Sequence, residues 1–134
     1  MRQIYVGCSL TQSSDKFRAF VFSFKAKLAK AVPCTVLEFK GLTEGSNADV
    51  FEHDLNNVRT SDALIFIVDY PAIGLGMEIG EAIVLKKPIL CLHAKDASVT
   101  RMLRGASELG RVRMDTYEDE VDAVSKAANF VAKL

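Results

Sequence analysis

The stretch ALIFIVDYPAIGLGMEIG, residues 63–80, decides the fold of this chain. It opens with the unbroken apolar run Ala63–Val68, which is typical of a strand buried on both faces of a parallel sheet. The run is then interrupted by turn-forming residues, namely Pro71, Gly74 and Gly76. Helical spacing resumes at once and predicts a helix over residues 76–86, with Glu78 in its first turn. Strand, glycine-rich turn and helix together form the repeating unit of an open α/β sheet.

The rest of the chain alternates in the same way. Further strands are predicted near residues 3–7, 35–39, 88–92 and 112–114. Further helices are predicted near residues 15–31, with Asp15 as the N-cap, and near 48–60, 100–109 and 118–133. This order predicts a three-layer α/β/α sandwich around a five-stranded parallel sheet of the Rossmann or flavodoxin type. With 134 residues, the chain is expected to form a single domain, residues 1–134.

The composition excludes several classes of function. Lys and Arg balance Asp and Glu at 17 each, so no basic field indicates a nucleic acid polymer as partner. No apolar run approaches the roughly 18 residues of a membrane span, and no secretory signal pattern precedes Tyr5. The three cysteines, Cys8, Cys34 and Cys91, lack metal-site spacing and are predicted to be reduced core thiols. We therefore expect a cytosolic protein without a metal or another cofactor.

Glu78 is the first candidate for chemistry. Open α/β sheets bind ligands at the carboxyl ends of their strands, and Glu78 follows the central strand directly. The field of a helix start would keep its carboxylate ionised, as a nucleophile requires. The alternative is a simple helix-start acid beside glycines that serve close packing.

Asp54 and Tyr5 are the next candidates. On a helix, Asp54 shares a face with Val58, so its carboxylate is expected to point toward the interior and to act as an acid or base. Glycoside cleavage needs such a second carboxylate. A phenol at Tyr5, in the first strand, can hydrogen-bond a carboxylate and hold its rotamer. The alternatives are a solvated helix face for Asp54 and a core position for Tyr5.

A basic cluster occupies the C-terminal third. It consists of Arg101, Arg104, Arg111 and Arg113. These arginines could be solvated surface charge. The alternative is that they contact a phosphate or a protein interface. His93 lacks a Cys or Asp partner in the sequence and is expected to be structural.

Several of these segments together resemble a known family. DLNNVRTSD at residues 54–62 and PAIGLGMEIG at 71–80 resemble the nucleoside 2-deoxyribosyltransferase superfamily, whose members share a DL…D helix and a GxGxExG turn. Within that superfamily the likeness is to the 2'-deoxynucleoside 5'-monophosphate N-glycosidases. It rests on Ile4-Tyr5-Val6 with Ser9, on ILCL at residues 89–92 and on MLRGA at 102–106.

The resemblance implies roles for individual residues. Glu78 matches the glutamate that attacks the sugar C1', Asp54 the aspartate that binds the sugar and assists departure of the base, and Tyr5 the tyrosine that orients the nucleophile. Ser9 matches a serine that contacts the phosphate. Thr100 falls where the hydrolases place a serine that reaches the neighbouring subunit's phosphate site, which implies a homodimer. The remaining substrate-binding positions are Leu10, Thr11, Ala72, Gly74, Gly76 and Met102.

Two positions depart from the family pattern. Ala72 stands where the nucleotide hydrolases have a phosphate-binding serine, and Thr11 where they have an arginine. A charged hydrogen bond contributes about 1.5–3 kcal/mol, so both changes weaken a phosphate site unless other groups compensate.

The resemblance therefore predicts hydrolysis of the N-glycosidic bond of 2'-deoxynucleoside 5'-monophosphates through a covalent glycosyl-glutamate. Two alternatives stay open at this point. One is a deoxyribosyltransferase that moves the sugar between bases. The other is a module that binds a nucleotide without turning it over.

Overall fold

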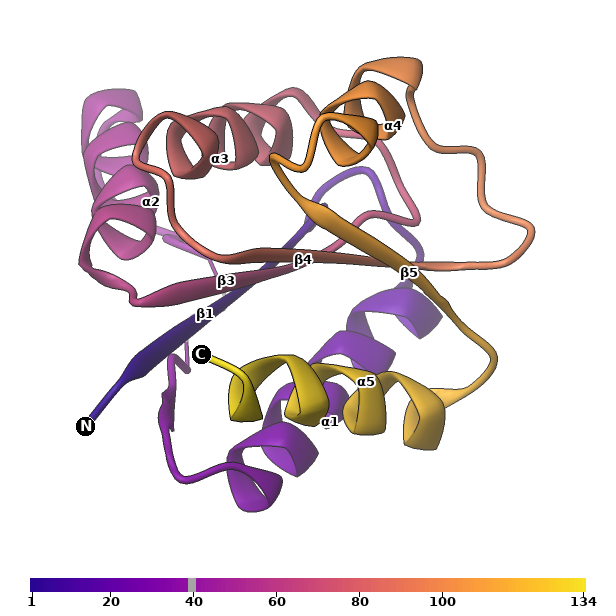
Figure 1. The fold of residues 1–134 in the computed structure, drawn as a ribbon. Helices are drawn as coiled ribbons and strands as arrows, with labels where there is room; N and C mark the ends of the chain where they lie inside the picture. Colours follow the sequence, from indigo (N-terminus) through magenta and orange to yellow (C-terminus); the bar gives the residue numbers. More distant parts are fainter. Residues whose placement is uncertain (39–40) are drawn as a thin grey trace.

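The computed structural model of this chain describes residues 1–38 and 41–134. Strands and helices alternate along the chain (Figure 1). The strands are β1 (Gln3–Cys8), β2 (Thr35–Val36), β3 (Ala63–Ile67), β4 (Ile89–Ala94) and β5 (Arg113–Tyr117). The helices are α1 (Asp15–Ala31), α2 (Asn47–Thr60), α3 (Ile73–Val84), α4 (Arg101–Glu108) and α5 (Glu120–Ala132).

All five strands are parallel and lie in the order β2-β1-β3-β4-β5. Helices α1 and α5 cover one face of the sheet, and α2, α3 and α4 cover the other (Figure 1). The predicted three-layer α/β/α sandwich is therefore confirmed. The strand order changes direction between β1 and β3, so a crevice at the carboxyl ends of these two strands is the expected ligand site.

Strand residues alternate between two cores. Ile4 of β1 and Ile65 of β3 face the α1 and α5 side, whereas Tyr5 and Phe66 face the α2 and α3 side. Because the register of β1 and β3 pairs Gly7 with Phe66, a Cβ at position 7 would lie 2.8 Å from the Phe66 ring. Glycine at this position therefore makes room for Phe66, whose ring packs edge-on against Tyr5 at a centroid distance of 6.4 Å.

Several predicted boundaries were wrong. Helix α3 begins at Ile73 rather than near 76, so Gly74 and Gly76 belong to its first turns instead of a preceding turn. Pro71 ends the extended segment, and the burial of Leu75 holds these glycines in helical conformation. The N-cap of α1 is Ser14 instead of Asp15, because the Ser14 hydroxyl accepts from the Phe17 amide.

Strand β2 is shorter than predicted and β5 is longer. Strand β2 pairs with β1 only at Thr35 and Val36, and the predicted end at residue 39 lies outside the described residues. Strand β5 extends to Tyr117 because it pairs with β4 over five residues.

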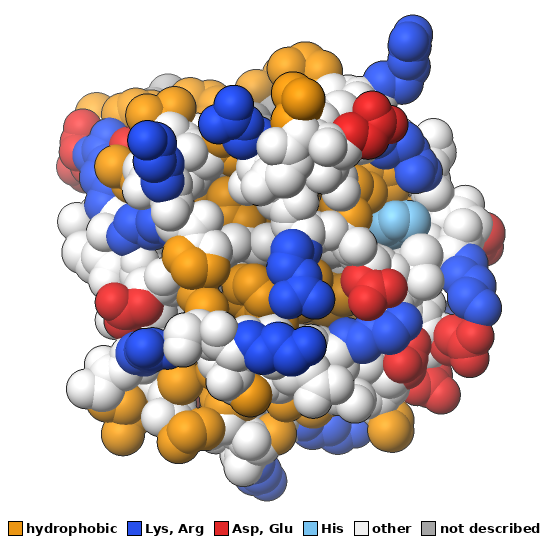
Figure 2. Space-filling model, in the orientation of Figure 1, with side chains coloured by type: hydrophobic (Ala, Val, Ile, Leu, Met, Phe, Trp, Pro, Cys, Tyr) orange, Lys and Arg blue, Asp and Glu red, His pale blue; other side chains and the backbone are white. Residues whose placement is uncertain are grey.

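The surface carries mixed charge (Figure 2), and the cysteines are free thiols. Charged side chains of both signs are spread over the face shown in Figure 2. Within residues 1–38 and 41–134, no helix is long and apolar enough to span a membrane. The same residues hold no group of three or more His, Cys, Asp or Glu side chains arranged for a metal ion. All three cysteines are free thiols, but only Cys91 is fully buried, because Cys8 and Cys34 lie at the margins of the core.

Candidate active site

Tyr5 and Glu78 form a buried pair between the sheet and α3. The Tyr5 hydroxyl donates to Oε1 of Glu78 at 2.5 Å. Tyr5 projects from β1 toward the α2 and α3 side, and α3 directs Glu78 back over the sheet, where it is only 6% exposed. The sheet register and one helix thus bring together two residues that lie 73 positions apart in the sequence.

The surroundings of Glu78 differ from those predicted. Glu78 lies in the second turn of α3 instead of the first, so it lies past the strongest part of the helix-start field. Burial raises its pKa to about 7, and the charge of Asp54 adds to this rise, while the Tyr5 hydrogen bond and Lys25 act in the opposite direction. The expected helix-start field therefore does not set the protonation of Glu78, because burial has the larger effect on its pKa. At neutral pH this carboxyl group is close to the midpoint of its titration.

Asp54 lies beside this pair. It is half-buried on α2, and its Oδ1 is buried without a hydrogen-bond partner among the described residues. Burial raises the pKa of Asp54, while His53 lowers it. The charge of Asp54 in turn raises the pKa of both Tyr5 and Glu78, so the three side chains share one electrostatic environment. A raised pKa is what a proton donor near neutral pH requires.

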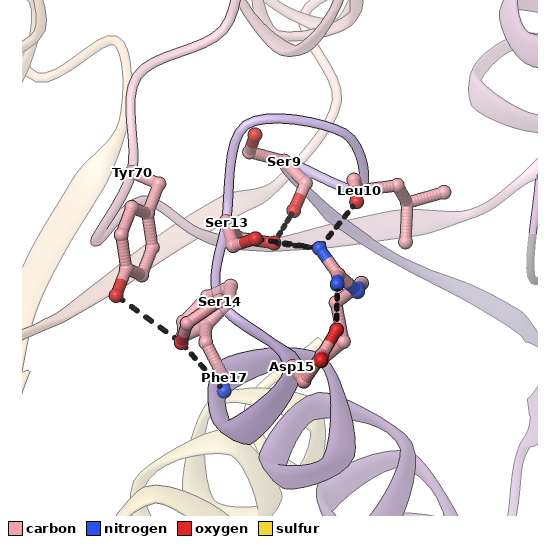
Figure 3. A network of polar contacts seen from close by, with 8 residues as sticks. Ser9, Leu10, Ser13, Ser14, Asp15, Phe17 and Tyr70 are labelled. Atoms are coloured by element: carbon pink, nitrogen blue, oxygen red, sulfur yellow. Dashed lines mark hydrogen bonds and ion pairs between the residues drawn. The ribbon is translucent and has the colours of Figure 1, made fainter.

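The loop after β1 is held from below by Arg18 of α1. The Arg18 guanidinium donates to the carbonyls of Leu10, at 3.0 Å, and Ser13, at 2.5 Å, and also contacts Asp15. The Ser13 hydroxyl donates to the Ser9 carbonyl at 2.7 Å, so both ends of the loop are tied together (Figure 3). Ser9 is 2% exposed, and its own hydroxyl has no hydrogen-bond partner among the described residues.

The sequence did not single out Arg18. It lies in the helical pattern of α1 as an ordinary polar residue, and nothing in its spacing indicates that it reaches back to the loop. A cation close to several loop carbonyls is a tertiary feature, because the loop must first fold over the helix start.

An open cleft continues from this loop along the strand ends. We call it the strand-end cleft; it has a volume of about 840 Å³. Its lining residues are uncharged: Thr11, Gln12, Pro71, Ala72, Ile73, Gly74, Thr100 and Met102. Five of the residues predicted to bind substrate thus meet here, and Gly76 lines the adjoining pocket together with Thr100. Leu10 is half-buried and contributes its carbonyl to the contact with Arg18.

The start of α3 borders this cleft and is open. Ala72 is the N-cap and gives the helix no side-chain hydrogen bond. A Cβ at Gly74 or at Gly76 would meet no other atom within 4 Å, so these glycines do not serve close packing. The first amides of α3 therefore offer donors to a ligand, and a helix start favours an anion.

His93 is buried and has a local role. Its Nδ1 lies 2.8 Å from the carbonyl oxygen of Ala94, as expected for a structural residue.

Comparison with known proteins identifies the family. The chain is 33% identical to the 5-hydroxymethyl-dUMP N-hydrolase of Branchiostoma floridae over 100 residues, which cover 68% of this chain and 94% of that protein. This chain belongs to the family of the 5-hydroxymethyl-dUMP N-hydrolases. The rat member of this hydrolase family is 35% identical over 83 residues, covering 60% of this chain. The match spans only about half, 51%, of the rat protein's length.

Solved structures share the fold of this hydrolase family. The CMP N-glycosidase of Clostridium botulinum superposes with a TM-score of 0.76 at 17% identity, over 96% of this chain and 99% of that one. A 2-deoxyribosyltransferase of Bacillus psychrosaccharolyticus superposes with a TM-score of 0.63 at 17% identity, over 91% of this chain and 90% of that one. No family model matches the sequence. The resemblance inferred from the motifs is confirmed by the hydrolase relatives.

Proposed function

We propose that this chain hydrolyses the N-glycosidic bond of 2'-deoxynucleoside 5'-monophosphates. The observation that carries the proposal is the buried hydrogen bond from Tyr5 to Glu78, with the charge of Asp54 acting on both residues. Membership in a family of nucleotide N-hydrolases supports the same reaction class. The products would be the free base and 2-deoxyribose 5-phosphate.

In the first step, Glu78 acts as the nucleophile. Its carboxylate oxygen forms a bond to C1' of the sugar, the bond from C1' to the base nitrogen breaks, and its electron pair leaves with the base. Asp54, with a raised pKa, binds the sugar and supplies a proton to the departing base. Tyr5 holds Glu78 in one rotamer, which reduces the orientational cost of attack.

In the second step, water attacks C1' of the glycosyl ester. The bond from C1' to the Glu78 oxygen breaks, its electron pair returns to the carboxylate, and the water proton passes to a nearby base such as Asp54. Because Glu78 must be ionised to attack again, its pKa of about 7 predicts activity that increases with pH through neutrality.

The strand-end cleft has no cationic lining residue, so uncharged groups would hold the phosphate. Thr11 and Thr100 line this cleft, the Ser9 hydroxyl lacks a partner, and the start of α3 is open. Hydroxyl groups and helix-start amides are suitable phosphate donors. Arg18 keeps the donor loop in place through its carbonyl contacts. These groups would compensate for the absence of the serine and arginine that positions 72 and 11 have in the family pattern.

We also propose that two copies assemble through α3 and α4. The outer side of α3 exposes the apolar side chains of Ile73 (87% exposed), Met77 (49%) and Val84 (77%), and Met102 of α4 is 86% exposed. Covering these side chains would remove apolar surface from water beside the strand-end cleft. Such a dimer would place Thr100 near the neighbouring site, as the family resemblance implies. A cytosolic location stays a prediction.

Chromatographic detection of free base tests the reaction. The protein is incubated with each deoxynucleoside and its 5'-monophosphate, with and without an acceptor base. We expect base release from the monophosphates alone, and its loss in Glu78→Ala. Release that needs an acceptor base, from unphosphorylated nucleosides, would identify a transferase instead. Binding without any base release would identify a non-catalytic nucleotide-binding module.

A further inference from the structure

A second cavity lies at the opposite end of the sheet, where β4 and β5 begin. It has a volume of about 360 Å³ and shares no lining residue with the strand-end cleft. We call it the basic groove, because its cationic lining residues are Lys86, Lys87, Arg111 and Arg113. It therefore contains half of the arginine cluster noted in the sequence, and the proposed glycosidase reaction does not use it.

The charges of the basic groove are unbalanced. No Asp or Glu lines it, although the chain as a whole carries equal numbers of acids and bases. Lys87 is already engaged, since its ammonium donates to the carbonyls of Arg59 and Ser61. Lys86, Arg111 and Arg113 are exposed, and none of them forms an ion pair within the described part of the chain. Three positive charges thus face one hollow without a carboxylate.

The ends of α3 and α4 meet at this groove and close with the same backbone motif. The amide of Gly110 donates to the Ser107 carbonyl at 3.0 Å, and the amide of Arg111 donates to the Ala106 carbonyl at 2.8 Å. At the end of α3, Lys86 and Lys87 make the corresponding bonds to Ile83 and Ala82, at 3.0 and 3.2 Å. In this motif the first residue after the helix, here Gly110 or Lys86, adopts the left-handed backbone conformation. Glycine adopts this conformation most easily.

The two helix ends differ in the residue at the left-handed position. Helix α4 has Gly110 there, with a φ of 72°, whereas α3 has Lys86, with a φ of 56°. Lys86 is the only non-glycine residue with a positive φ among the described residues. The chain thus keeps a strained backbone at a position where glycine would relieve it and where the side chain belongs to the groove. Strain of this kind is often found where a side chain is needed, and the side chain of Lys86 lines the groove.

The floor of the basic groove is apolar. Ile89, Val112 and Phe130 are buried beneath the cationic rim. An apolar floor accommodates a ring, while the guanidinium groups and the ammonium pair with phosphate oxygens. The volume lies within the range of small-ligand sites, and the neutral net charge argues against a nucleic acid polymer.

We infer that the basic groove is a second binding site, for a nucleoside polyphosphate, remote from the site of glycosidic cleavage. The base would lie on the apolar floor, and the phosphate chain would extend over Lys86, Arg111 and Arg113. Occupation of this groove leaves the strand-end cleft free, because the two lie at opposite ends of the parallel strands.

Calorimetric titration tests this site with three probes: ATP, inorganic triphosphate and adenosine. We expect ATP to bind with a dissociation constant in the micromolar range, and both partial ligands to bind at least about tenfold more weakly. Arg111→Gln/Arg113→Gln is expected to weaken ATP binding at least about tenfold. Lys86→Gly is expected to weaken it as well and, by relieving backbone strain, to raise the midpoint of thermal unfolding.

The matched control is Lys16→Gln/Lys30→Gln, which removes two exposed charges from α1 and is expected to leave ATP binding unchanged. Base release from monophosphates should stay within about twofold in both groove variants, so this site is tested separately from the glycosidase. Absence of ATP binding, or ATP binding that ignores the groove variants, would overturn the inference. So would inorganic triphosphate that binds as tightly as ATP, because the apolar floor would then have no role.

Discussion

Two carboxylate–phenol pairs lie on opposite faces of the sheet, and they differ in the surroundings of the carboxylate. Glu78 accepts from Tyr5 in the core between the sheet and α2 and α3. Asp69 accepts from Tyr117, at 2.6 Å, on the α1 and α5 side, and it also accepts from the Ala94 amide at 3.2 Å. Burial raises the pKa of both carboxyl groups, but two hydrogen bonds and His93 oppose the rise at Asp69.

The difference supports the proposal that Glu78, and not Asp69, is the reactive carboxylate. Asp69 ties β3 to β4 and β5 through its two donors, so its carboxylate has a fixed set of partners. Glu78 is more deeply buried, and Asp54 repels its charge. A buried carboxylate, once ionised, is a stronger nucleophile than a solvated one, because less hydration must be lost before it attacks.

Replacing each carboxylate gives the largest expected contrast. Glu78→Gln removes the proposed nucleophile and is expected to reduce base release by about 10³-fold or more. Asp69→Asn keeps an acceptor of the same shape and is expected to retain activity within about fivefold. Initial rates from deoxynucleoside monophosphates measure both effects, with circular dichroism to confirm that each variant is folded. Equal loss in the two variants would contradict the distinction drawn between the pairs.

Replacing each phenol tests the same contrast at the hydrogen bond. Tyr5→Phe is expected to lower kcat up to about 100-fold, because Glu78 loses the group that fixes its rotamer. It should also move the rising limb of the pH profile to higher pH, since the Tyr5 hydrogen bond lowers the pKa of Glu78. Tyr117→Phe should instead reduce the free energy of unfolding by about 1–2 kcal/mol and leave the pH profile in place. Denaturant titrations and pH profiles of both variants decide between these outcomes.

The pH dependence of stability tests the burial of Glu78. A pKa raised from 4.5 to about 7 in the folded protein means that stability is lost as pH rises through this range, because the ionised form is disfavoured by burial. Glu78→Gln removes that loss. Its free energy of unfolding should match that of the wild type near pH 4 and exceed it at pH 8, by up to about 3 kcal/mol. A constant difference between the two proteins across this range would show that Glu78 does not carry the shift.

Gly7→Ala perturbs only the pair that contains Tyr5. The added Cβ would lie 2.8 Å from the Phe66 ring and 3.3 Å from Tyr5, so both aromatic side chains must shift. We expect a loss of about 1–3 kcal/mol in stability and a reduced kcat. Unfolding curves and initial rates measure the two effects. The matched control is Ala123→Gly, on the α5 side of the sheet. It should reduce stability without changing kcat. If it lowers kcat as much as Gly7→Ala does, then Gly7 does not act through Tyr5.

The sequence predicted the architecture and most helix starts well, but it misplaced the start of α3. Buried apolar runs such as Ala63–Val68 identify parallel strands, because a strand covered on both faces needs no polar side. The start of α3 was misplaced, because Gly74 and Gly76 favour a turn locally and only packing of Leu75 and Ile79 makes them helical. Cys8 and Cys34 were placed in the core on hydrophobicity alone, although both lie at its margin.

The sequence by itself determined the order of strands and helices, and its motifs indicated the family and the acidic residues to examine. Only the tertiary structure brought Tyr5 within 2.5 Å of Glu78, and only it buried that carboxyl group enough to raise its pKa to about 7. It alone also revealed the contact of Arg18 with the first loop and the cationic groove at the far end of the sheet. The physical reason is that side-chain periodicity is a local property of the chain, whereas desolvation and charge depend on which distant residues surround a group.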